Sequence, residues 1–292
     1  MVDATSGEKY SVTALMALYD LEPTLRDIYV EGRTDAVFFD WYFSERGLDA
    51  RAYAIDDRVE FLPHELEGMQ FDSGCRGRVI SLAVHASRSL GTDHRGITCV
   101  VDADFGRVIG PMPIADAHLL HTDGAALECY ALQERPLTKL LRLGLGLEQT
   151  ISARDVLAAI CPALIDLYLA RAVLYALGVR CIDAPMKLAK LDSKGVSLSL
   201  GLVIERSIGT LSRSERPVAA EDAIAWAEDL RPGTDSELGR GHDIALMLSA
   251  CLGLKPPLGS PQALEAAMRT SLDIDDLVDQ PLFVKLEERL AS

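Results

Sequence analysis

The first 135 residues alternate short apolar runs with polar segments of helix length. The runs Asp27–Val30, Arg51–Ile55, Ile97–Val101 and Ala117–His121 are strand candidates. Between them, Thr34–Arg46 and Gly77–Leu90 carry apolar residues at helical spacing, with Thr34 as a candidate N-cap and Gly47 as a stop. Strands separated by helix-length segments are typical of a parallel sheet with helices on its faces. The pattern predicts an α/β fold with a small parallel sheet.

The second half of the chain has a mainly helical pattern. The predicted helices are Ser152–Ala176, Ala219–Leu230, His242–Cys251, Pro261–Met268 and Pro281–Leu290. One stretch, Val196–Ile204, alternates and favours a strand. The change of pattern near Pro136 predicts a domain over residues 1–135 and a mainly helical domain over 136–292, which would bind substrate or a partner.

Composition and charge narrow the class of protein. The chain is 49% hydrophobic, which is ordinary for a globular protein, and its net charge of −15 makes indiscriminate coating of nucleic acid unfavourable. It does not exclude an enzyme that holds nucleic acid through metal ions or a partner. The six cysteines form no C-x-x-C, which favours reduced thiols over a zinc or redox site. The first residues lack a signal-peptide pattern, and the apolar stretch Val156–Val179 contains Pro162, Asp166 and Arg171. We therefore expect a cytoplasmic protein that does not enter a membrane.

Acidic residues follow the predicted strands directly. They are Glu31, Asp35, Asp102, Asp104, Asp123 and Glu128. Each alone is explained by a turn, a helix cap or a capping box. Together they stand at successive strand ends, where parallel sheets bind ligands, and carboxylates without His or Cys suit Mg²⁺ or Mn²⁺. The sequence therefore predicts a divalent-cation site at one edge of the sheet.

Three segments carry a family resemblance. IYVEGRTD (Ile28–Asp35) followed by VVDADFG (Val100–Gly106) resembles the toprim domain of topoisomerases, bacterial primases and related nucleases. HTDGAALECY (His121–Tyr130) resembles a narrower branch, the bacterial proteins labelled domain of unknown function 4435, which includes the toprim nuclease of the PARIS phage-defence system. The resemblance covers residues 25–135, and RGHDIALML (Arg240–Leu248) is matched loosely. The interval between Glu31 and Asp102 is longer than the family pattern.

The resemblance implies roles for these carboxylates. Glu31 would be the general acid/base or a metal-linked carboxylate, and Asp102 and Asp104 the principal metal ligands. Asp35, Asp123 and Glu128 would complete a second metal position. The implied protein is a Mg²⁺-dependent nuclease acting on DNA or on RNA such as tRNA, as a phage-defence effector controlled by a separate ABC-type ATPase; a homo-oligomer is compatible with this.

Two other classes of function stay open. One is a non-catalytic regulatory or scaffold subunit that keeps the fold and binds a partner protein. The other is primase-like nucleotidyl transfer, against which the lack of a recognisable template-binding module weighs. The sequence contains no G-x-x-x-x-G-K-[ST] motif, so no P-loop is predicted in it.

Basic residues of the second half are candidates for substrate contact. Lys187, Lys190 and Lys194 have the spacing of one helix face, which is typical of phosphate contact or of a solvated surface. His242 follows Gly239 and Gly241 and is expected to open a helix, with contact to substrate as the alternative.

Overall fold

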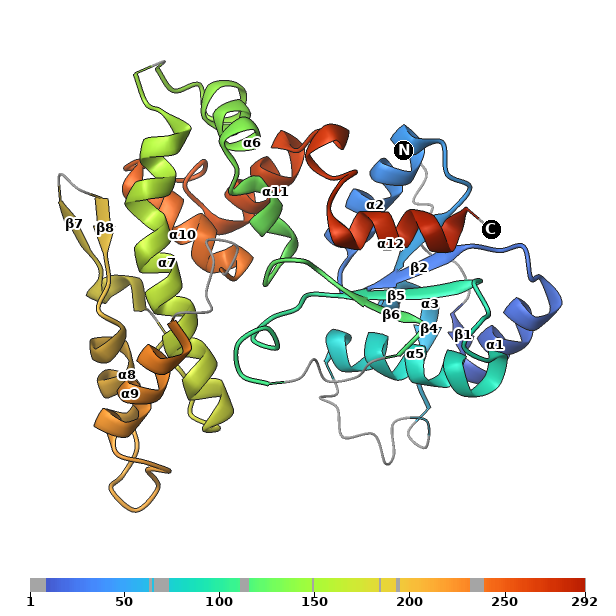
Figure 1. Cartoon of the computed structure of the whole chain (residues 1–292), viewed down its shortest axis with the longest axis horizontal. Helices are drawn as coiled ribbons and strands as arrows, with labels where there is room; N and C mark the ends of the chain where they lie inside the picture. Colours follow the sequence, from blue (N-terminus) through green and yellow to red (C-terminus); the bar gives the residue numbers. More distant parts are fainter. Residues whose placement is uncertain are drawn as a thin grey trace. The chain divides into compact units, whose positions relative to one another are not determined.

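A computed structural model describes residues 9–62, 65, 74–110, 116–148, 150–183, 185–192, 195–231 and 239–291 (Figure 1). The chain divides into two compact units. Unit 1 comprises residues 1–102, 113–123 and 277–292, and unit 2 comprises residues 103–112 and 124–276.

Unit 1 contains a four-stranded parallel sheet in the order β3-β2-β5-β6. Its strands are β2 (Asp27–Val30), β3 (Arg51–Ala54), β5 (Ile97–Val101) and β6 (Leu119–His121). Tyr29 on β2 lies opposite Tyr53 on β3 and Cys99 on β5, so the two central strands are in close register. The predicted strands and the α/β class with a small parallel sheet flanked by helices are confirmed.

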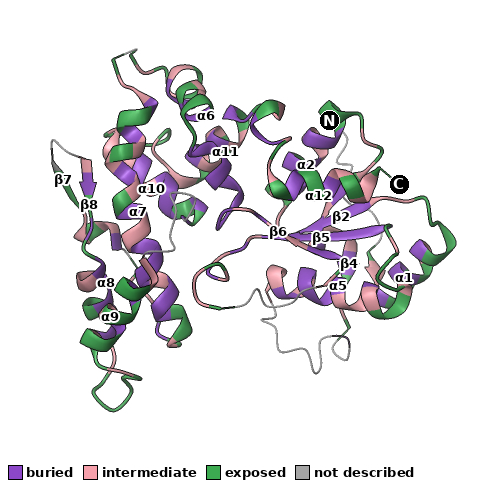
Figure 2. Ribbon diagram, in the orientation of Figure 1, coloured by how far each residue is buried: buried purple, intermediate pink, exposed green. Residues whose placement is uncertain are grey.

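Helices cover both faces of this sheet. In Figure 1, α1 (Val12–Leu21) and α5 (Cys75–Leu90) lie on one face, and α2 (Arg33–Arg46) and α12 (Pro281–Leu290) on the other. Side chains alternate between the faces of a strand. Tyr29, Ile97 and Cys99 therefore join Leu15 and Leu82 in one buried cluster. Figure 2 shows the strands of this sheet coloured mainly as buried. Beside the sheet, β1 (Tyr10–Ser11) pairs in parallel with β4 (Val59–Glu60), and α3 (Ile55–Arg58) precedes β4.

The start of α2 differs from the expectation. Gly32, and not Thr34, is the N-cap, because the glycine has extended backbone angles and its carbonyl accepts a hydrogen bond from the Ala36 N–H at 3.0 Å. The predicted stop is confirmed, since Gly47 ends the helix with a φ of 64°, a left-handed conformation that glycine adopts without strain.

The units also differ from the predicted boundary at Pro136. The last helix, α12, belongs to unit 1, while residues 103–112 and 124–135 belong to unit 2. Aromatic packing explains the return of α12, because the Phe283 and Tyr42 ring centroids lie 4.7 Å apart. Arg289 adds a hydrogen bond of 2.9 Å from its Nε to Thr98 Oγ1 on β5. This contact between sequence-distant segments has no local signal in the sequence.

Unit 2 is built around α7 (Ala153–Ala176). The other helices described in this unit are α6 (Glu134–Lys139), α8 (Leu200–Gly209), α9 (Ala220–Leu230), α10 (Gly241–Cys251) and α11 (Pro261–Ser271). Its shorter elements are η1 (Leu127–Ala131), η2 (Leu140–Gly144), η3 (Pro185–Leu188) and η5 (Ile274–Asp276), with the antiparallel hairpin of β7 (Lys190–Asp192) and β8 (Gly195–Ser197). By length and composition α7 could cross a membrane, but 56% of its most apolar window is buried inside the protein, as in a core helix.

The predicted strand Val196–Ile204 is wrong in most of its length. β8 ends at Ser197, and α8 begins at Leu200. Ser199 caps this helix by accepting a hydrogen bond from the Leu202 N–H at 3.3 Å. The alternation that favoured a strand overlaps a helical pattern that buries Leu200, Val203 and Ile204.

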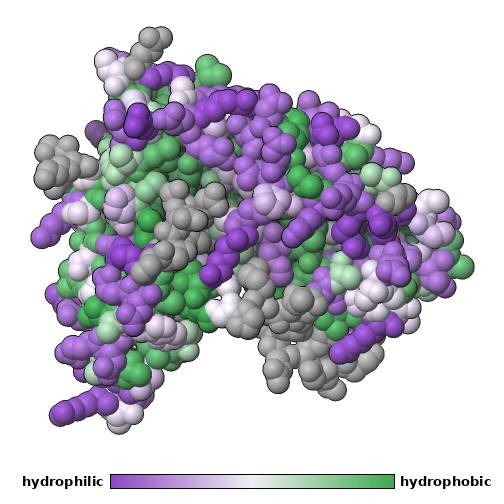
Figure 3. Space-filling model, viewed as in Figure 1, coloured by the Kyte–Doolittle hydropathy of each residue, from purple (hydrophilic) through white to green (hydrophobic). Residues whose placement is uncertain are grey.

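The surface mixes residue types. On the face drawn in Figure 3, hydrophilic and hydrophobic residues are interspersed. Some large apolar side chains are well exposed, among them Leu21 and Leu143.

Candidate functional site

Glu31 and Asp102 meet at the carboxyl end of the unit 1 sheet. Glu31 follows β2 and Asp102 follows β5, and these strands are direct neighbours. The Asp102 backbone N–H donates to Glu31 Oε1 at 3.3 Å. The sheet therefore brings together the two residues that the sequence placed after separate strands.

Arg76 also belongs to this part of the site. It lies in the first turn of α5, donates from its guanidinium to the Asp102 carbonyl oxygen, and has Nη1 4.0 Å from Glu31 Oε1. Its side chain is 24% exposed and that of Glu31 is 29% exposed, so solvent reaches both groups. The N-terminus of a helix carries a partial positive charge, which adds to that of the guanidinium.

Two further carboxylates extend the row along the sheet. Asp56 and Asp57 lie in α3, directly after β3. Asp56 forms an ion pair of 2.9 Å with Arg78, and Asp57 one of 2.7 Å with Arg33. We call the row formed by Asp56, Asp57, Glu31, Asp102 and Asp123 the carboxylate edge. Within it, the ion pairs of Asp56 and Asp57 are short, at 2.9 and 2.7 Å, and that of Glu31 with Arg76 is long, at 4.0 Å.

Sequence reasoning missed three members of this arrangement. They are Arg76, Asp56 and Asp57. Asp56 and Asp57 follow the predicted strand Arg51–Ile55, so the rule that selected Glu31 and Asp102 also selects them. Arg76 carries a weaker signal, since it stands among glycines at the start of a helix that leads into a buried strand.

Asp35 and Asp123 have different surroundings within unit 1. Asp35 lies in the first turn of α2, where its Oδ2 would be 3.3 Å from a Cβ on Gly32. Asp123 accepts a hydrogen bond from the Leu282 N–H at 3.1 Å, at the start of α12. A carboxylate in that position stabilises the helix N-terminus. Asp123 therefore has a structural task, whatever else it binds.

Asp104 and Glu128 belong to unit 2. Asp104 has a φ of 46°, a left-handed conformation rare outside glycine, and its N–H donates to the Ala125 carbonyl at 3.0 Å. Glu128 is buried in η1 and pairs with Arg269 at 2.6 Å. A Cβ on Gly241 would come within 2.2 Å of Glu128 Oε2, so this carboxylate lies against the first turn of α10. Its role as a metal ligand stays a prediction, beside a structural role in unit 2.

The basic residues do not share a helix face. Lys187 lies in η3 and Lys190 on β7, so the predicted helical stripe is wrong for these two, and Lys194 lies outside the described residues. The chain changes from the short η3 turn to the strand β7 between Lys187 and Lys190, so the two side chains lie on different kinds of element. His242 does open a helix, as expected, being the second residue of α10. Its Nδ1 lies 3.3 Å from Glu265 Oε1.

The donor set at Glu31 and Asp102 fits a hard cation. Within the described ranges no group of three or more His, Cys, Asp or Glu side chains is arranged to hold a metal ion. Mg²⁺ does not need such a cage, because it keeps several waters and is commonly held by one or two carboxylates together with substrate phosphates. Partly exposed carboxylates that follow two adjacent strands therefore match Mg²⁺ or Mn²⁺ better than a metal that requires a closed shell.

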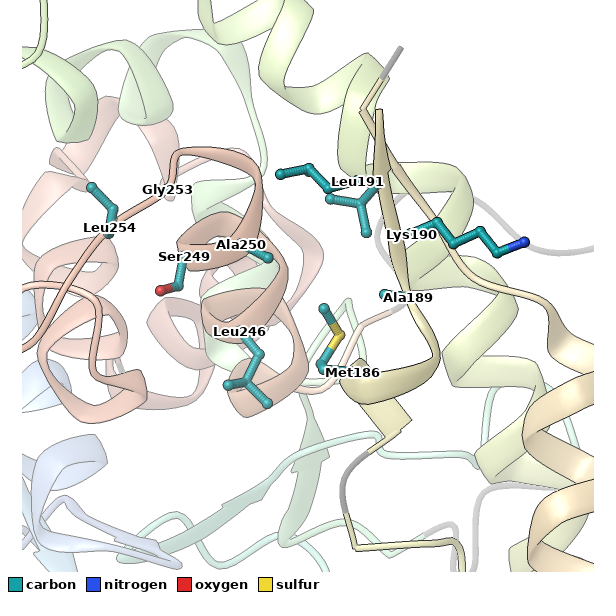
Figure 4. Close-up of a pocket in the computed structure, with 10 residues that line it drawn as sticks. Met186, Ala189, Lys190, Leu191, Leu246, Ser249, Ala250, Gly253 and Leu254 are labelled. Carbon is teal, nitrogen blue, oxygen red and sulfur yellow. The ribbon is translucent and has the colours of Figure 1, made fainter. Parts of the chain in front are cut away.

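Unit 2 contains a separate pocket of about 440 Å³ (Figure 4). It lies between α10 with its following turn and the segment from η3 to β8, and most of its lining is apolar. In Figure 4, Leu246 and Met186 approach each other across it, while the Lys190 amine points away. Because this lining is mostly apolar, we place the candidate site at Glu31 and Asp102, in the middle of the carboxylate edge.

Comparison with known proteins adds no family to this description. No protein-family model matches the chain, and no curated protein matches it.

Proposed function

We propose that this protein is a metal-dependent nuclease that hydrolyses phosphodiester bonds of nucleic acid. The observation that carries the proposal is the meeting of Glu31 and Asp102 at the ends of two adjacent parallel strands, with the Arg76 guanidinium beside them. Ligands of open parallel sheets bind beyond the carboxyl ends of the strands. The resemblance of Ile28–Asp35 and Val100–Gly106 to the toprim domain supports the same chemistry.

In this proposal Glu31 and Asp102 hold Mg²⁺ or Mn²⁺, and for Asp104, the second acid of the D-x-D, a role as metal ligand rests on the resemblance alone. A bound divalent ion would polarise the phosphate and lower the pKa of its water. Glu31 is partly exposed and can exchange a proton with solvent or substrate. Arg76 has a charge and a fixed position suited to a phosphate oxygen, and its contact with the Asp102 carbonyl limits its movement.

The test is cleavage of labelled DNA and tRNA by the full chain, with and without Mg²⁺ or Mn²⁺. We expect metal-dependent cleavage, which Glu31→Gln and Asp102→Asn each reduce by roughly 10²- to 10⁴-fold, the range for loss of an acid–base or charge-stabilising group. Asp57→Asn is the matched control, because Asp57 lies on the same edge but is paired with the exposed Arg33. Metal-dependent cleavage that survives Glu31→Gln at the wild-type rate would contradict the proposal.

We also propose that the nuclease acts in phage defence under the control of a separate ABC-type ATPase. The net charge of −15 supports assistance in capturing a polyanion, and the narrower resemblance is to an effector paired with such an ATPase. Expression alone and together with neighbouring gene products, followed by pull-down and toxicity assays, tests this. We expect an ATPase to co-purify and toxicity to depend on it. An isolated protein that degrades nucleic acid rapidly at physiological salt and binds no ATPase would contradict the partner, but not the nuclease.

A further inference from the structure

In unit 2, an exposed tyrosine and an exposed arginine both lie against the ring of the same phenylalanine. Tyr175, near the end of α7, is 68% exposed, although a tyrosine side chain is usually well covered. Its ring centroid lies 5.4 Å from that of Phe105, with the planes tilted by 41°. The Arg240 guanidinium lies 5.8 Å from the Phe105 centroid, and Arg240 is exposed. We call Phe105, Tyr175 and Arg240 the aromatic platform.

The platform has a rigid support. Tyr168 lies two helical turns before Tyr175 on α7, is buried, and has its ring centroid 5.4 Å from that of Phe105. Its hydroxyl donates to the Asp104 carbonyl oxygen. This bond fixes the segment that carries Phe105 against α7.

The charges beside the platform leave Arg240 available. Asp243, the nearest acid along α10, is buried and paired with Arg171 at 2.8 Å. Among the described residues, no carboxylate lies within ion-pair distance of Arg240. Its guanidinium lies over the Phe105 ring. An exposed aromatic ring and an available guanidinium, both lying against Phe105, form the combination that binds stacked bases and backbone phosphate.

We propose that the aromatic platform binds unpaired nucleotides of a nucleic-acid substrate, with a base stacked on Tyr175 and a phosphate at Arg240. This rests on the proposed nuclease function for its class of ligand. Bases of an intact double helix are stacked on each other and cannot reach such a ring, so the platform selects single-stranded segments, loops or ends. Stacking accepts every base, so we expect little sequence preference.

Binding is measured without cleavage, on the full chain in EDTA. The probes are fluorescent oligo(dT) and oligo(U) single strands of about 15 nucleotides and a fluorescent blunt duplex of the same length. Fluorescence anisotropy of each probe reports binding. We expect Tyr175→Ala to weaken single-strand binding by roughly 5- to 10-fold, the low end of the range for loss of one stacking ring. Tyr175→Phe keeps the ring and should bind within about twofold of wild type. Duplex binding should change less than single-strand binding.

Two further variants separate stacking from general effects. Trp226→Ala removes a partly exposed aromatic side chain elsewhere in unit 2 and should leave binding unchanged. Arg240→Ala should weaken binding and lower the salt slope by about 0.7, the value for one phosphate contact on a single strand, while Arg240→Lys keeps most of that slope. Circular dichroism of each variant checks the fold, and Tyr175 is too exposed for its loss to unfold the unit.

The outcomes distinguish this inference from the proposed function. If wild type cleaves nucleic acid with Mg²⁺ but Tyr175→Ala binds single strands as tightly as wild type, the platform is overturned and the nuclease stands. If wild type cleaves nucleic acid with Mg²⁺ but does not bind single strands in EDTA, the platform is likewise overturned and the nuclease stands. If wild type neither cleaves nor binds any probe, both are overturned.

Discussion

Glu31 in unit 1 differs from Glu128 and Asp243 in unit 2 in its exposure to solvent and in the length of its ion pair. At the carboxylate edge of unit 1, the Glu31 side chain is 29% exposed, and its Oε1 lies 4.0 Å from Arg76 Nη1. In unit 2, Glu128 and Asp243 have side chains only 5% exposed and pair with arginines at 2.6 and 2.8 Å. The first arrangement can exchange partners with water, a cation or a substrate. The second cannot do so without leaving a buried charge uncompensated.

Exposure and pairing separate acidic residues that can take part in chemistry from those that stabilise the fold, although the sequence alone does not distinguish them. A buried carboxylate must keep its cation, because the low-dielectric interior penalises a lone charge. An accessible carboxylate at a strand end is solvated and does not need a fixed partner, so it can bind a cation or a substrate.

Arg269→Ala should lower the free energy of unfolding by about 3–5 kcal/mol, because it leaves the Glu128 charge buried without its partner. Urea denaturation followed by circular dichroism measures this. The double variant Glu128→Gln/Arg269→Met removes both charges and should recover most of the loss.

The matched control is an exposed pair in unit 1. Arg33 is 72% exposed, and Arg33→Ala should change the unfolding free energy by at most about 1 kcal/mol, despite the 2.7 Å contact with Asp57. Equal effects of Arg269→Ala and Arg33→Ala would remove the contrast between buried and accessible pairs.

Gly241→Ala should destabilise unit 2 by about 1–3 kcal/mol, the range for overpacking a core. The added methyl group would come 2.2 Å from Glu128 Oε2 and 2.6 Å from its Cδ, so the buried carboxylate or α10 must shift. The control is Gly209→Ala in α8, where a Cβ meets nothing within 4 Å. Alanine favours helix over glycine, so Gly209→Ala should be neutral or stabilising by up to about 1 kcal/mol. A similar loss at both sites would show that Glu128 does not approach α10 closely.

The sequence predicts unit 1 better than unit 2 for physical reasons. Strands such as Ile97–Val101 are buried on both faces and are therefore apolar throughout, and the helix stop at Gly47 is local backbone chemistry. Because parallel strands share one carboxyl edge, the meeting of Glu31 and Asp102 also follows from sequence. Partners that come from distant segments do not. Arg76 reaches Glu31, Arg269 reaches Glu128 and α12 reaches the first sheet through tertiary packing, which leaves no local pattern. The predicted helical stripe of lysines is wrong because spacing alone does not register that Lys190 lies on β7, which pairs with β8 in a hairpin.

The two ends of β2 also differ, with a buried carboxylate, Asp27, at the start and an accessible one, Glu31, after the end. The pH dependence of stability tests the buried one. Asp27, at the start of β2, is 6% exposed and accepts a hydrogen bond from Tyr19 Oη at 2.6 Å. Burial raises the pKa of the Asp27 carboxyl, against the lowering by the Tyr19 hydrogen bond and by Arg58. The unfolded chain then releases this proton at lower pH than the folded chain does. Its contribution to stability is full below the ordinary pKa of aspartate and falls as pH rises through the raised value.

Asp27→Asn removes that titration. We expect the unfolding free energy of wild type, relative to Asp27→Asn, to decrease as pH rises from about 4 toward neutrality. Urea titrations of both proteins at several pH values measure the difference. A difference that is constant with pH, or that increases, would show that Asp27 is not held in a desolvated site.

The smallest expected effect completes the comparison at the other end of β2. Glu31→Gln should change the unfolding free energy by less than about 0.5 kcal/mol, as is usual for substitutions outside buried networks. The amide keeps an acceptor oxygen for the Asp102 N–H. It removes only a charge that lies 4.0 Å from the Arg76 guanidinium. The same variant should lose cleavage, so activity and stability respond in opposite ways at the carboxylate edge and at Glu128. If Glu31→Gln instead destabilises the protein as strongly as Arg269→Ala does, Glu31 is part of the structural framework, and any loss of cleavage in that variant reports unfolding and not chemistry.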